Sequence, residues 1–298
     1  MKGRIIKNIS NDYTICCSDG TVYTCKPRGK FRLNEITPLV GDIVEFDEIN
    51  NYILNIEPRT NELIRPSIAN IDIAVVVTSV KKPDFDTVLL DKTLTIISYN
   101  NINPIIYLTK LDLLNEDEKK IIDKYYQYYH KIGYIVITNP KDLIKKITDK
   151  TVVFTGQSGA GKSTLLNKIN PYLKLKTDEI SDALGRGKHT TRHTELYDID
   201  GTFIADTPGF SKIDFIGMKD IDIRDNMKEM FDNLEYCKYK DCMHTSEDGC
   251  HVIELVKNNE ILKSRYNNYR SFINRWLYGN SNLNSKRKRQ NKKYKITK

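Results

Sequence analysis

A glycine-rich loop in the middle of the chain dictates the fold around it. An apolar run at residues 151–154 predicts a buried strand, and the pattern from Lys162 onward predicts a helix. The loop between them has the form G-x-x-x-x-G-K-[ST], whose backbone N–H groups cradle phosphate oxygens while Lys162 reaches the β- and γ-phosphates and Ser163 holds Mg²⁺. The sequence therefore predicts an α/β domain with a nucleotide-phosphate site. The predicted binding residues are Gly156, Gln157, Ser158, Gly159, Ala160, Gly161, Lys162, Ser163 and Thr164.

A second phosphate-site element follows an apolar strand at residues 202–205. Asp206 stands at the end of that strand, where a carboxylate holds Mg²⁺ in proteins with such loops. Gly209 leaves a backbone amide free to approach the γ-phosphate. The basic segment at residues 185–193 carries two hydroxyls, and we interpret it as a switch loop that orders around Mg²⁺ and the γ-phosphate.

The identity of the nucleotide base is predicted from the motif Thr109-Lys110-Leu111-Asp112, which follows an apolar strand at residues 105–108. This motif resembles the N/T-K-x-D motif of GTP-binding proteins, in which the aspartate accepts hydrogen bonds from guanine and the lysine packs over the ring. Thr109 replaces the usual asparagine, so we expect a weaker link to the phosphate loop. The expected Ser-Ala guanine loop is replaced by Thr138-Asn139-Pro140, in which the Asn139 amide is the candidate to face guanine O6.

The order of these motifs is unusual. In Ras-like proteins the phosphate loop comes first and the guanine motif last, whereas here Asp112 precedes Gly156 by 44 residues. An α/β layer tolerates such a rearrangement where its chain ends lie close together. The order predicts a circularly permuted GTPase.

Three regions are distinguished by their patterns. Residues 1–65 show short alternating runs separated by turns, which predicts a small antiparallel barrel of the OB type. Residues 66–217 alternate strands with helices, which predicts a parallel sheet covered on both faces. Residues 218–298 are helical and include a helix at about residues 266–277. The predicted fold is therefore multi-domain: an OB-type β-barrel, an α/β circularly permuted P-loop GTPase domain and an α-helical zinc-binding domain with a basic tail.

The zinc prediction rests on four soft or borderline ligands within 14 residues, spaced Cys237-x4-Cys242-x-His244-x5-Cys250. Three thiolates and one imidazole complete a tetrahedral shell with no open position, which predicts one structural Zn²⁺. Two alternatives stay open: free thiols in a loop, and His251 in place of His244. The other cysteines are interpreted as small buried hydrophobes; they are Cys16, Cys17 and Cys25.

The formal net charge of +8 is concentrated at the C-terminus. Residues 286–298 hold eight basic side chains and no acidic one, so the rest of the chain is neutral overall. Such a block suits a phosphate backbone, and we interpret it as a nucleic-acid contact, with a solubilising tail as the alternative. No apolar run approaches the length that spans a bilayer and no signal peptide is recognised, which predicts a cytoplasmic protein without a membrane partner. We expect a monomer.

Together these features resemble the ribosome small-subunit-dependent GTPase A (RsgA) family. The resemblance covers essentially the whole chain and rests on residues 156–163, 185–191, 206–210 and 237–250, with Arg65-Pro66 and Ala69-Asn70-Ile71-Asp72 at the domain junction. It implies a GTPase that binds the small ribosomal subunit and its rRNA and assists late maturation. Its slow hydrolysis of GTP to GDP and phosphate would be stimulated by that subunit.

The resemblance also implies roles for the switch residues. Thr191 or Thr190 would be the threonine on Mg²⁺, and His189 would act in hydrolysis, with His193 as the next candidate; Lys162, His189 and Thr191 are the predicted catalytic residues. Phe210 stands where Ras-like enzymes place a water-orienting glutamine, so we expect slow intrinsic hydrolysis unless a partner supplies this function.

Two other classes of protein fit part of the sequence. One is a P-loop ATPase or kinase with a zinc knuckle, which competition between guanine and adenine nucleotides distinguishes. The other is an RNA-binding translation factor that uses GTP only as a sensor, which hydrolysis with and without ribosomal subunits distinguishes.

Overall fold

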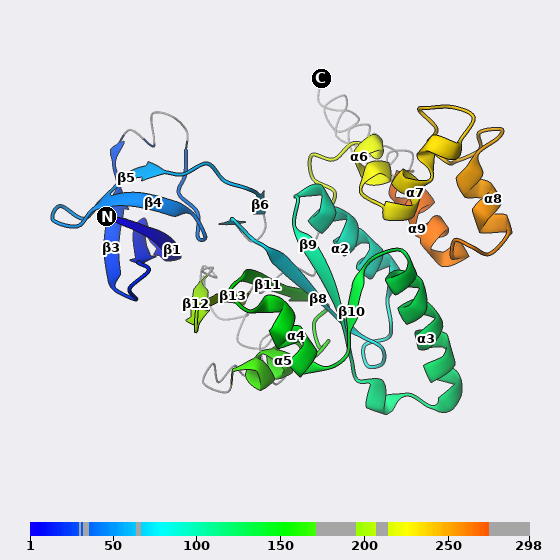
Figure 1. The fold of residues 1–298 in the computed structure, drawn as a ribbon, viewed down its shortest axis with the longest axis horizontal. Coiled ribbons are helices and arrows are strands. Elements are labelled where there is room, and N and C mark those ends of the chain that lie inside the picture. The colour runs from blue at the N-terminus through cyan, green and yellow to red at the C-terminus, as the bar shows by residue number, and fades with distance from the viewer. Residues whose placement is uncertain (30, 32–35, 64–66, 171–194, 207–213, 274–298) are drawn as a thin grey trace, which may run out of the picture. The chain divides into compact units, whose positions relative to one another are not determined.

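The computed structural model describes residues 1–29, 31, 36–63, 67–170, 195–206 and 214–273. Contacts divide the chain into two compact units. One contains Met1–Asp86 and Ile96–Asp214, and the other contains Thr87–Thr95 and the chain from Phe215 onward. The first unit holds a β-barrel and a six-stranded sheet, and the second is helical (Figure 1). The finer division at residues 1–65, 66–217 and 218–298 stays a prediction.

A closed five-stranded barrel forms the N-terminal region. Its strands are β1 (Lys2–Ile9), β2 (Asp12–Cys16), β3 (Val22–Pro27), β4 (Ile43–Asp47) and β5 (Tyr52–Ile56). They are hydrogen-bonded in the order β1-β2-β3-β5-β4. The expectation of an antiparallel barrel is wrong at one place, because β3 and β5 pair in parallel. Five is an odd number, so strand direction cannot alternate all the way round a closed barrel and one neighbouring pair must be parallel.

The barrel core comes from side chains that alternate along these strands. Ile5, Ile15, Val44 and Ile53 are completely buried. In strand β1 a β-bulge between Ile5 and Lys7 interrupts the alternation. The interpretation of the N-terminal cysteines is confirmed: all three are buried, and burial raises the pKa of their thiols; they are Cys16, Cys17 and Cys25.

The sheet of the first unit has six strands. They are β8 (Ile73–Ser79), β9 (Asn103–Thr109), β10 (Ile135–Ile137), β11 (Thr151–Gly156), β12 (Leu196–Ile199) and β13 (Thr202–Asp206). The order β10-β9-β8-β11-β13-β12 places β11 at the centre, between β8 and β13. All seven residues of β8 are buried, as the continuous apolar runs of parallel sheets require. A separate two-stranded ladder joins β6 (Glu62–Leu63) to β7 (Ile68–Ala69).

The predicted parallel sheet carries one antiparallel strand, β12, at its edge. This strand pairs antiparallel with β13 through the turn Asp200-Gly201, in which both residues have positive φ angles of 49° and 84°. That geometry is the two-residue hairpin turn for which Asp-Gly is a preferred sequence. The Asp-Gly pair was therefore the signal for β12 that the sequence contained.

The helices of the α/β region follow its strands. They are α2 (Thr87–Tyr99), the 3-10 helix η1 (Leu111–Leu113), α3 (Glu116–Lys131), α4 (Pro140–Ile147) and α5 (Lys162–Ile169). A capping box begins α3: the Asn115 side chain accepts from the Glu118 backbone and the Glu118 carboxylate accepts from the Asn115 backbone. Leu143 of α4 and Leu166 of α5 belong to the buried cluster that contains Phe154 of β11. These two helices thus help to form the core beneath the glycine-rich loop.

The second unit consists of short helices. They are α6 (Asp220–Asp225), α7 (Lys228–Asp232), the 3-10 helix η6 (Leu234–Tyr236), α8 (His251–Lys257) and α9 (Lys263–Ile273). The helix expected at about residues 266–277 is α9, which begins at Lys263 and is described as far as Ile273. In the described part of the chain, none of the helices combines the length and apolar character that crossing a bilayer requires.

A buried ionic network holds the second unit together. Arg265 of α9 donates from Nε to the Glu229 carboxylate (2.7 Å) and from Nη1 to the Asp91 carboxylate of α2 (2.5 Å). Asn268 donates to the other oxygen of Asp91 at 2.7 Å. The side chains of Arg265, Asp91 and Glu229 are at most 3% exposed. The first part of α2 is therefore fastened to α7 and α9 by charged groups out of contact with water.

Candidate nucleotide site and metal centre

The glycine-rich loop lies where its motif predicts, between β11 and α5. A β-carbon at Gly156 would lie 2.2 Å from the carbonyl oxygen of Val77 on the neighbouring strand, so only glycine fits there. Gly161 occupies the N-cap of α5 with φ of 92°, a left-handed conformation that glycine adopts without strain. The loop therefore leads the backbone directly onto the N-terminus of α5, whose partial positive charge favours a bound anion.

The predicted phosphate-binding side chains lie at this helix start. Lys162, Ser163 and Thr164 form the first turn of α5, with Lys162 and Ser163 partly buried and Thr164 exposed. Asp206 ends β13, and the pairing of β13 with β11 aligns its backbone with Phe154. The carboxyl ends of two adjacent parallel strands thus bring the backbone of Asp206 close to the start of the loop.

Several predicted residues cannot be placed at this site because they lie outside the described residues. They are the predicted switch and phosphate residues His189, Thr190, Thr191, His193 and Gly209, together with Phe210, Arg65 and Pro66.

The guanine motif touches the phosphate loop directly. Strand β9 ends at Thr109, whose hydroxyl donates to the carbonyl of Ala160 at 2.6 Å. Lys110 donates from Nζ to the carbonyl of Gly159 at 2.7 Å and also to that of Lys82. We expected threonine to weaken this link, but its short side chain makes the hydrogen bond itself. Asp112, in η1, presents an exposed side chain beside this junction.

Asn139 has a structural role that was missed from sequence. It is the N-cap of α4, where its side chain accepts from the backbone N–H of Lys141 at 2.8 Å. Pro140 occupies the first turn, as is common at helix starts, so the Asn-Pro pair was the available signal. The proposed contact between the Asn139 amide and guanine stays a prediction.

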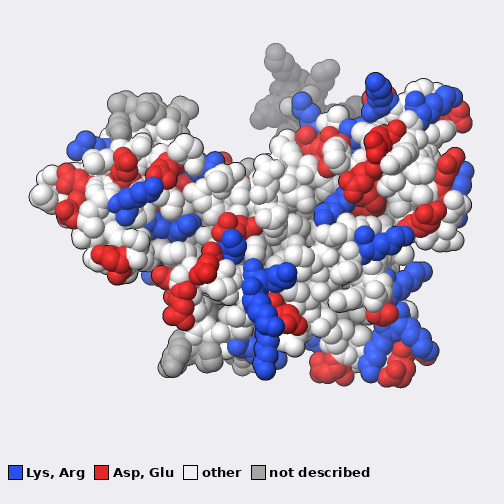
Figure 2. Space-filling view, in the orientation of Figure 1, with Lys and Arg blue, Asp and Glu red and all other residues white. Residues whose placement is uncertain are grey.

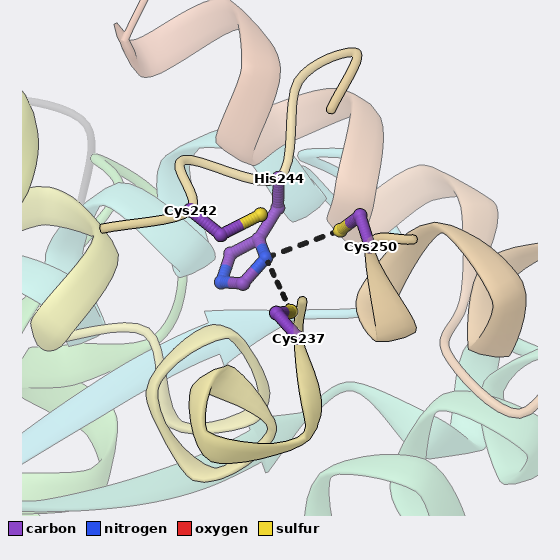
Figure 3. A group of neighbouring side chains, drawn as sticks. All are labelled: Cys237, Cys242, His244 and Cys250. Carbon is purple, nitrogen blue, oxygen red and sulfur yellow. Dashed lines mark hydrogen bonds between the residues drawn. The ribbon is translucent and has the colours of Figure 1, made fainter. Parts of the chain in front are cut away.

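The cysteine and histidine ligands predicted in the second unit come together. One ligand atom from each of Cys237, Cys242, His244 and Cys250 lies within 4.8 Å of all the others. Nδ1 of His244 is 3.6 Å from the sulfur of Cys237 and 3.3 Å from that of Cys250 (Figure 3). Zinc–sulfur bonds of about 2.3 Å and zinc–nitrogen bonds of about 2.0 Å in a tetrahedron separate sulfur from nitrogen by about 3.5 Å. The cluster is therefore compatible with one zinc ion.

The choice between His244 and His251 is decided by position. His244 is completely buried, and its Nε2 lies 3.0 Å from the carbonyl of Met230, a contact that directs Nδ1 toward the thiols. His251 begins α8, where its ring packs against Tyr236 and its Nδ1 lies 3.8 Å from the Glu254 carboxylate. His244 is thus the imidazole of the cluster.

The loop between the ligands is held by groups that the motif does not include. The Glu247 carboxylate accepts from the backbone N–H groups of Met243 (2.8 Å), Thr245 (2.6 Å) and Ser246 (2.9 Å). Burial on its own would raise the pKa of Glu247, but these hydrogen bonds lower it to about 2. The hydroxyl of Tyr266 donates to the His244 carbonyl at 2.7 Å. The loop therefore has an anionic anchor at its centre and a link to α9.

Replacing Glu247 with glutamine should lower the free energy of unfolding of the second unit at pH 7 by about 1–3 kcal/mol, because an amide satisfies fewer of these N–H donors. The native pKa lies below the value of about 4.3 for an unfolded glutamate. This stabilisation is therefore complete above about pH 4.3 and disappears as the pH falls toward about 2. Denaturant unfolding of both proteins at several pH values measures the difference.

The matched control is Asp248→Asn. Asp248 is the adjacent acidic residue, but it is exposed and pairs with Lys238 at the surface (3.0 Å), so its replacement should have little effect. Equal stability of wild type and Glu247→Gln at pH 7 would contradict the anchoring role.

Comparison with known proteins agrees with this arrangement. The family model described as RsgA GTPase matches residues 56–216, and the RsgA N-terminal domain model matches residues 2–53. A relative from Oceanobacillus iheyensis, named small ribosomal subunit biogenesis GTPase RsgA 2, is 48% identical over 91% of this chain and 96% of its own length. The relative named small ribosomal subunit biogenesis GTPase RsgA from Enterococcus faecalis is 46% identical over 92% of this chain and 94% of its own.

Two solved structures are also similar. The structure described as YloQ, a circularly permuted GTPase, superposes with a TM-score of 0.78 at 38% identity and covers 92% of this chain and 94% of its own. YjeQ from Thermotoga maritima superposes with a TM-score of 0.81 at 33% identity and covers 93% of this chain and 98% of its own. The description of YloQ as circularly permuted agrees with the order of motifs along this chain. The chain belongs to the RsgA GTPase family, and its α/β domain is a circularly permuted GTPase domain.

Proposed function

We propose that this protein hydrolyses GTP to GDP and phosphate in the biogenesis of the small ribosomal subunit, with hydrolysis stimulated by that subunit. The observation that carries the proposal is the contact of Thr109 and Lys110 with the carbonyls of Ala160 and Gly159. This contact joins the guanine motif at the end of β9 to the phosphate loop that follows β11, as a guanine-nucleotide site requires. The relatives that carry this function in their names match over more than nine-tenths of the chain.

The nucleotide-binding roles follow the motifs. Backbone N–H groups from Gly156 to Gly161 cradle the phosphates, Lys162 contacts the β- and γ-phosphates, and Asp112 accepts from guanine. Mg²⁺ is a hard cation that takes oxygen ligands, and the hydroxyl of Ser163 and the carboxylate of Asp206 belong to that class. Bound to the nucleotide, the ion neutralises the charge that develops on the phosphates. The roles of His189, Thr190, Thr191 and Gly209 rest on the sequence alone.

The metal proposed for the second unit is one structural Zn²⁺ held by Cys237, Cys242, His244 and Cys250. The donor set and its burial support zinc, because the shell is complete and leaves no position for a substrate. The ion would supply a rigid cross-link between the preceding loop and Cys250, the N-cap residue of α8.

Contact with rRNA is proposed for the basic tail at residues 286–298. On the described face in Figure 2, basic and acidic side chains alternate without a continuous field of one sign. The tail lies outside the described residues, and with its eight cations it carries the whole net charge of the chain. We propose that the protein works as a monomer in the cytoplasm, where ribosomal subunits are its partner.

Replacing Asp112 with asparagine tests the nucleotide assignment. We expect GTP affinity to fall about 100-fold or more, since two hydrogen bonds to a charged group contribute about 1.5–3 kcal/mol each. Xanthosine triphosphate should gain affinity, because its carbonyl can accept from the new amide. Competition binding with GTP, ATP and xanthosine triphosphate measures this selectivity.

Asp117→Asn is the matched control, since Asp117 is an exposed carboxylate in the first turn of α3 that pairs with Lys120. It should leave selectivity unchanged. Hydrolysis is measured in parallel with and without purified small subunits. Equal binding of ATP and GTP by the wild type would indicate an ATPase or kinase, and GTP hydrolysis that subunits leave unchanged would indicate a sensor.

A further inference from the structure

The outer face of β1 contacts the GTPase sheet. Arg4 and Lys7 are three residues apart, and in a regular strand such residues point to opposite faces. The β-bulge between Ile5 and Lys7 adds one residue and brings both side chains to the same side. Each then contacts the sheet through a hydrogen bond. The bulge therefore allows β1 to contribute Ile5 to the barrel core and to place both Arg4 and Lys7 against the sheet.

Arg4 contacts the beginnings of the two strands that carry the phosphate site. Its Nη1 donates to the hydroxyl of Thr151, the first residue of β11, at 3.1 Å. Its guanidinium lies 4.9 Å from the ring centre of Phe203, and Phe203 pairs with Thr151 in the sheet. At their other ends these strands carry Gly156 and Asp206. The barrel is therefore in direct contact with the strands that position the phosphate loop.

Lys7 contacts the residue just before strand β12. Its Nζ lies 2.9 Å from Oε1 of Glu195, and the two residues also form an antiparallel backbone bridge. The two side chains are 32% and 31% exposed, so the ion pair is partly protected from solvent. Glu195 immediately precedes β12, and the β12–β13 hairpin leads to Asp206. In sequence, Glu195 lies six residues or fewer after His189, Thr190 and Thr191.

We propose that Lys7 and Glu195 are positioning residues for subunit-stimulated GTP hydrolysis, coupling the barrel to the end of the chain segment that carries the predicted hydrolytic residues. The inference rests on the proposed function. An ion pair added to a backbone bridge holds the start of the β12–β13 hairpin at one register against β1. A subunit that engages the barrel then acts on the same rigid strand to which Glu195 is attached, and the effect reaches Asp206 through a short hairpin.

The experiment is a charge exchange in the full-length protein. The variants are Lys7→Glu, Glu195→Lys and the double variant, with Lys7→Met as a neutral form that keeps the length of the side chain. Subunit-stimulated kcat, the KM for GTP and basal hydrolysis are measured for each, after circular dichroism has shown that the variant is folded. Lys2→Glu is the matched control, because Lys2 is on the same strand and pairs with Glu57 within the barrel (2.5 Å).

We expect each single exchange to lower stimulated kcat about 2- to 30-fold, the range of coupling through a residue that contacts neither ligand. The KM for GTP and basal hydrolysis should stay within about 2-fold of wild type, and the double exchange should restore most of the stimulated rate. Lys2→Glu should keep the stimulated rate.

Three results would overturn the inference: wild-type stimulated kcat in both Lys7→Glu and Lys7→Met, an equal loss in Lys2→Glu, or failure of the double exchange to recover. A wild-type protein that subunits do not stimulate would instead contradict the proposed function. The two failures are therefore distinguishable within one experiment.

Discussion

Replacing Cys242 with serine is expected to remove zinc from the protein and to unfold the loop that carries its four ligands. Cys242 is 1% exposed, and its sulfur lies within 4.8 Å of the other three ligand atoms. A structural zinc site contributes about 10–16 kcal/mol of apparent binding free energy at neutral pH. Serine has almost the same size, but its hydroxyl does not ionise at this pH and replaces a thiolate poorly. A three-ligand shell at a buried position therefore loses most of this energy.

The loss should stay within the second unit. Elemental analysis should fall from one zinc per chain to none, and amide hydrogen exchange should accelerate across residues 233–258. GTP affinity should be preserved, because the phosphate loop and the guanine motif belong to the first unit.

Cys25→Ser is the matched control, since Cys25 is also 1% exposed but belongs to the barrel of the first unit and not to the metal cluster. It should retain zinc. A wild-type protein purified without zinc, or a Cys242→Ser variant that retains one ion, would contradict the proposed metal centre.

Replacing Arg265 with alanine should lower the free energy of unfolding of the second unit by about 3–5 kcal/mol, the usual cost of removing one member of a buried ionic group. The reason is the pair of carboxylates that would remain. Asp91 and Glu229 are 0% and 3% exposed, and both accept hydrogen bonds from the Arg265 guanidinium. Without that cation, both buried carboxylates lose their charged hydrogen-bond donor, and burying a charge without a charged partner is costly.

Two comparisons separate this effect from a loss of packing. Arg265→Lys keeps the charge but cannot supply three donors in a planar fork, so its effect should be intermediate. Arg270→Ala removes an exposed arginine from the same helix and should have little effect. Unfolding by urea, followed by the fluorescence of tyrosine, measures all three. If Arg265→Ala unfolded at the wild-type denaturant concentration, the network would carry no stabilising energy.

The local chemistry of this protein was readable from its sequence. The phosphate loop, its strand and its helix occupy the predicted residues because glycines at fixed spacing and an adjacent apolar run act within about 15 residues. The same holds for the zinc ligands, whose spacing over 14 residues already limits the shapes of the loop. The order of the guanine motif and the phosphate loop, which defines the permutation, is itself a property of the sequence.

Contacts between distant residues were decided by the tertiary structure. The sequence around Thr109 and around Ala160 gives no sign that these two residues form a hydrogen bond. Likewise, β3 and β5 must be parallel only because five strands close into a barrel. Arg265 and Asp91 are 174 residues apart, and Lys7 and Glu195 are 188 apart. Periodicity, capping and turn chemistry describe the backbone over one or two turns and contain no information on which charged groups meet across the fold. Arg265 and Asp91 meet because packing buries both groups, and a buried charge is costly unless it is paired.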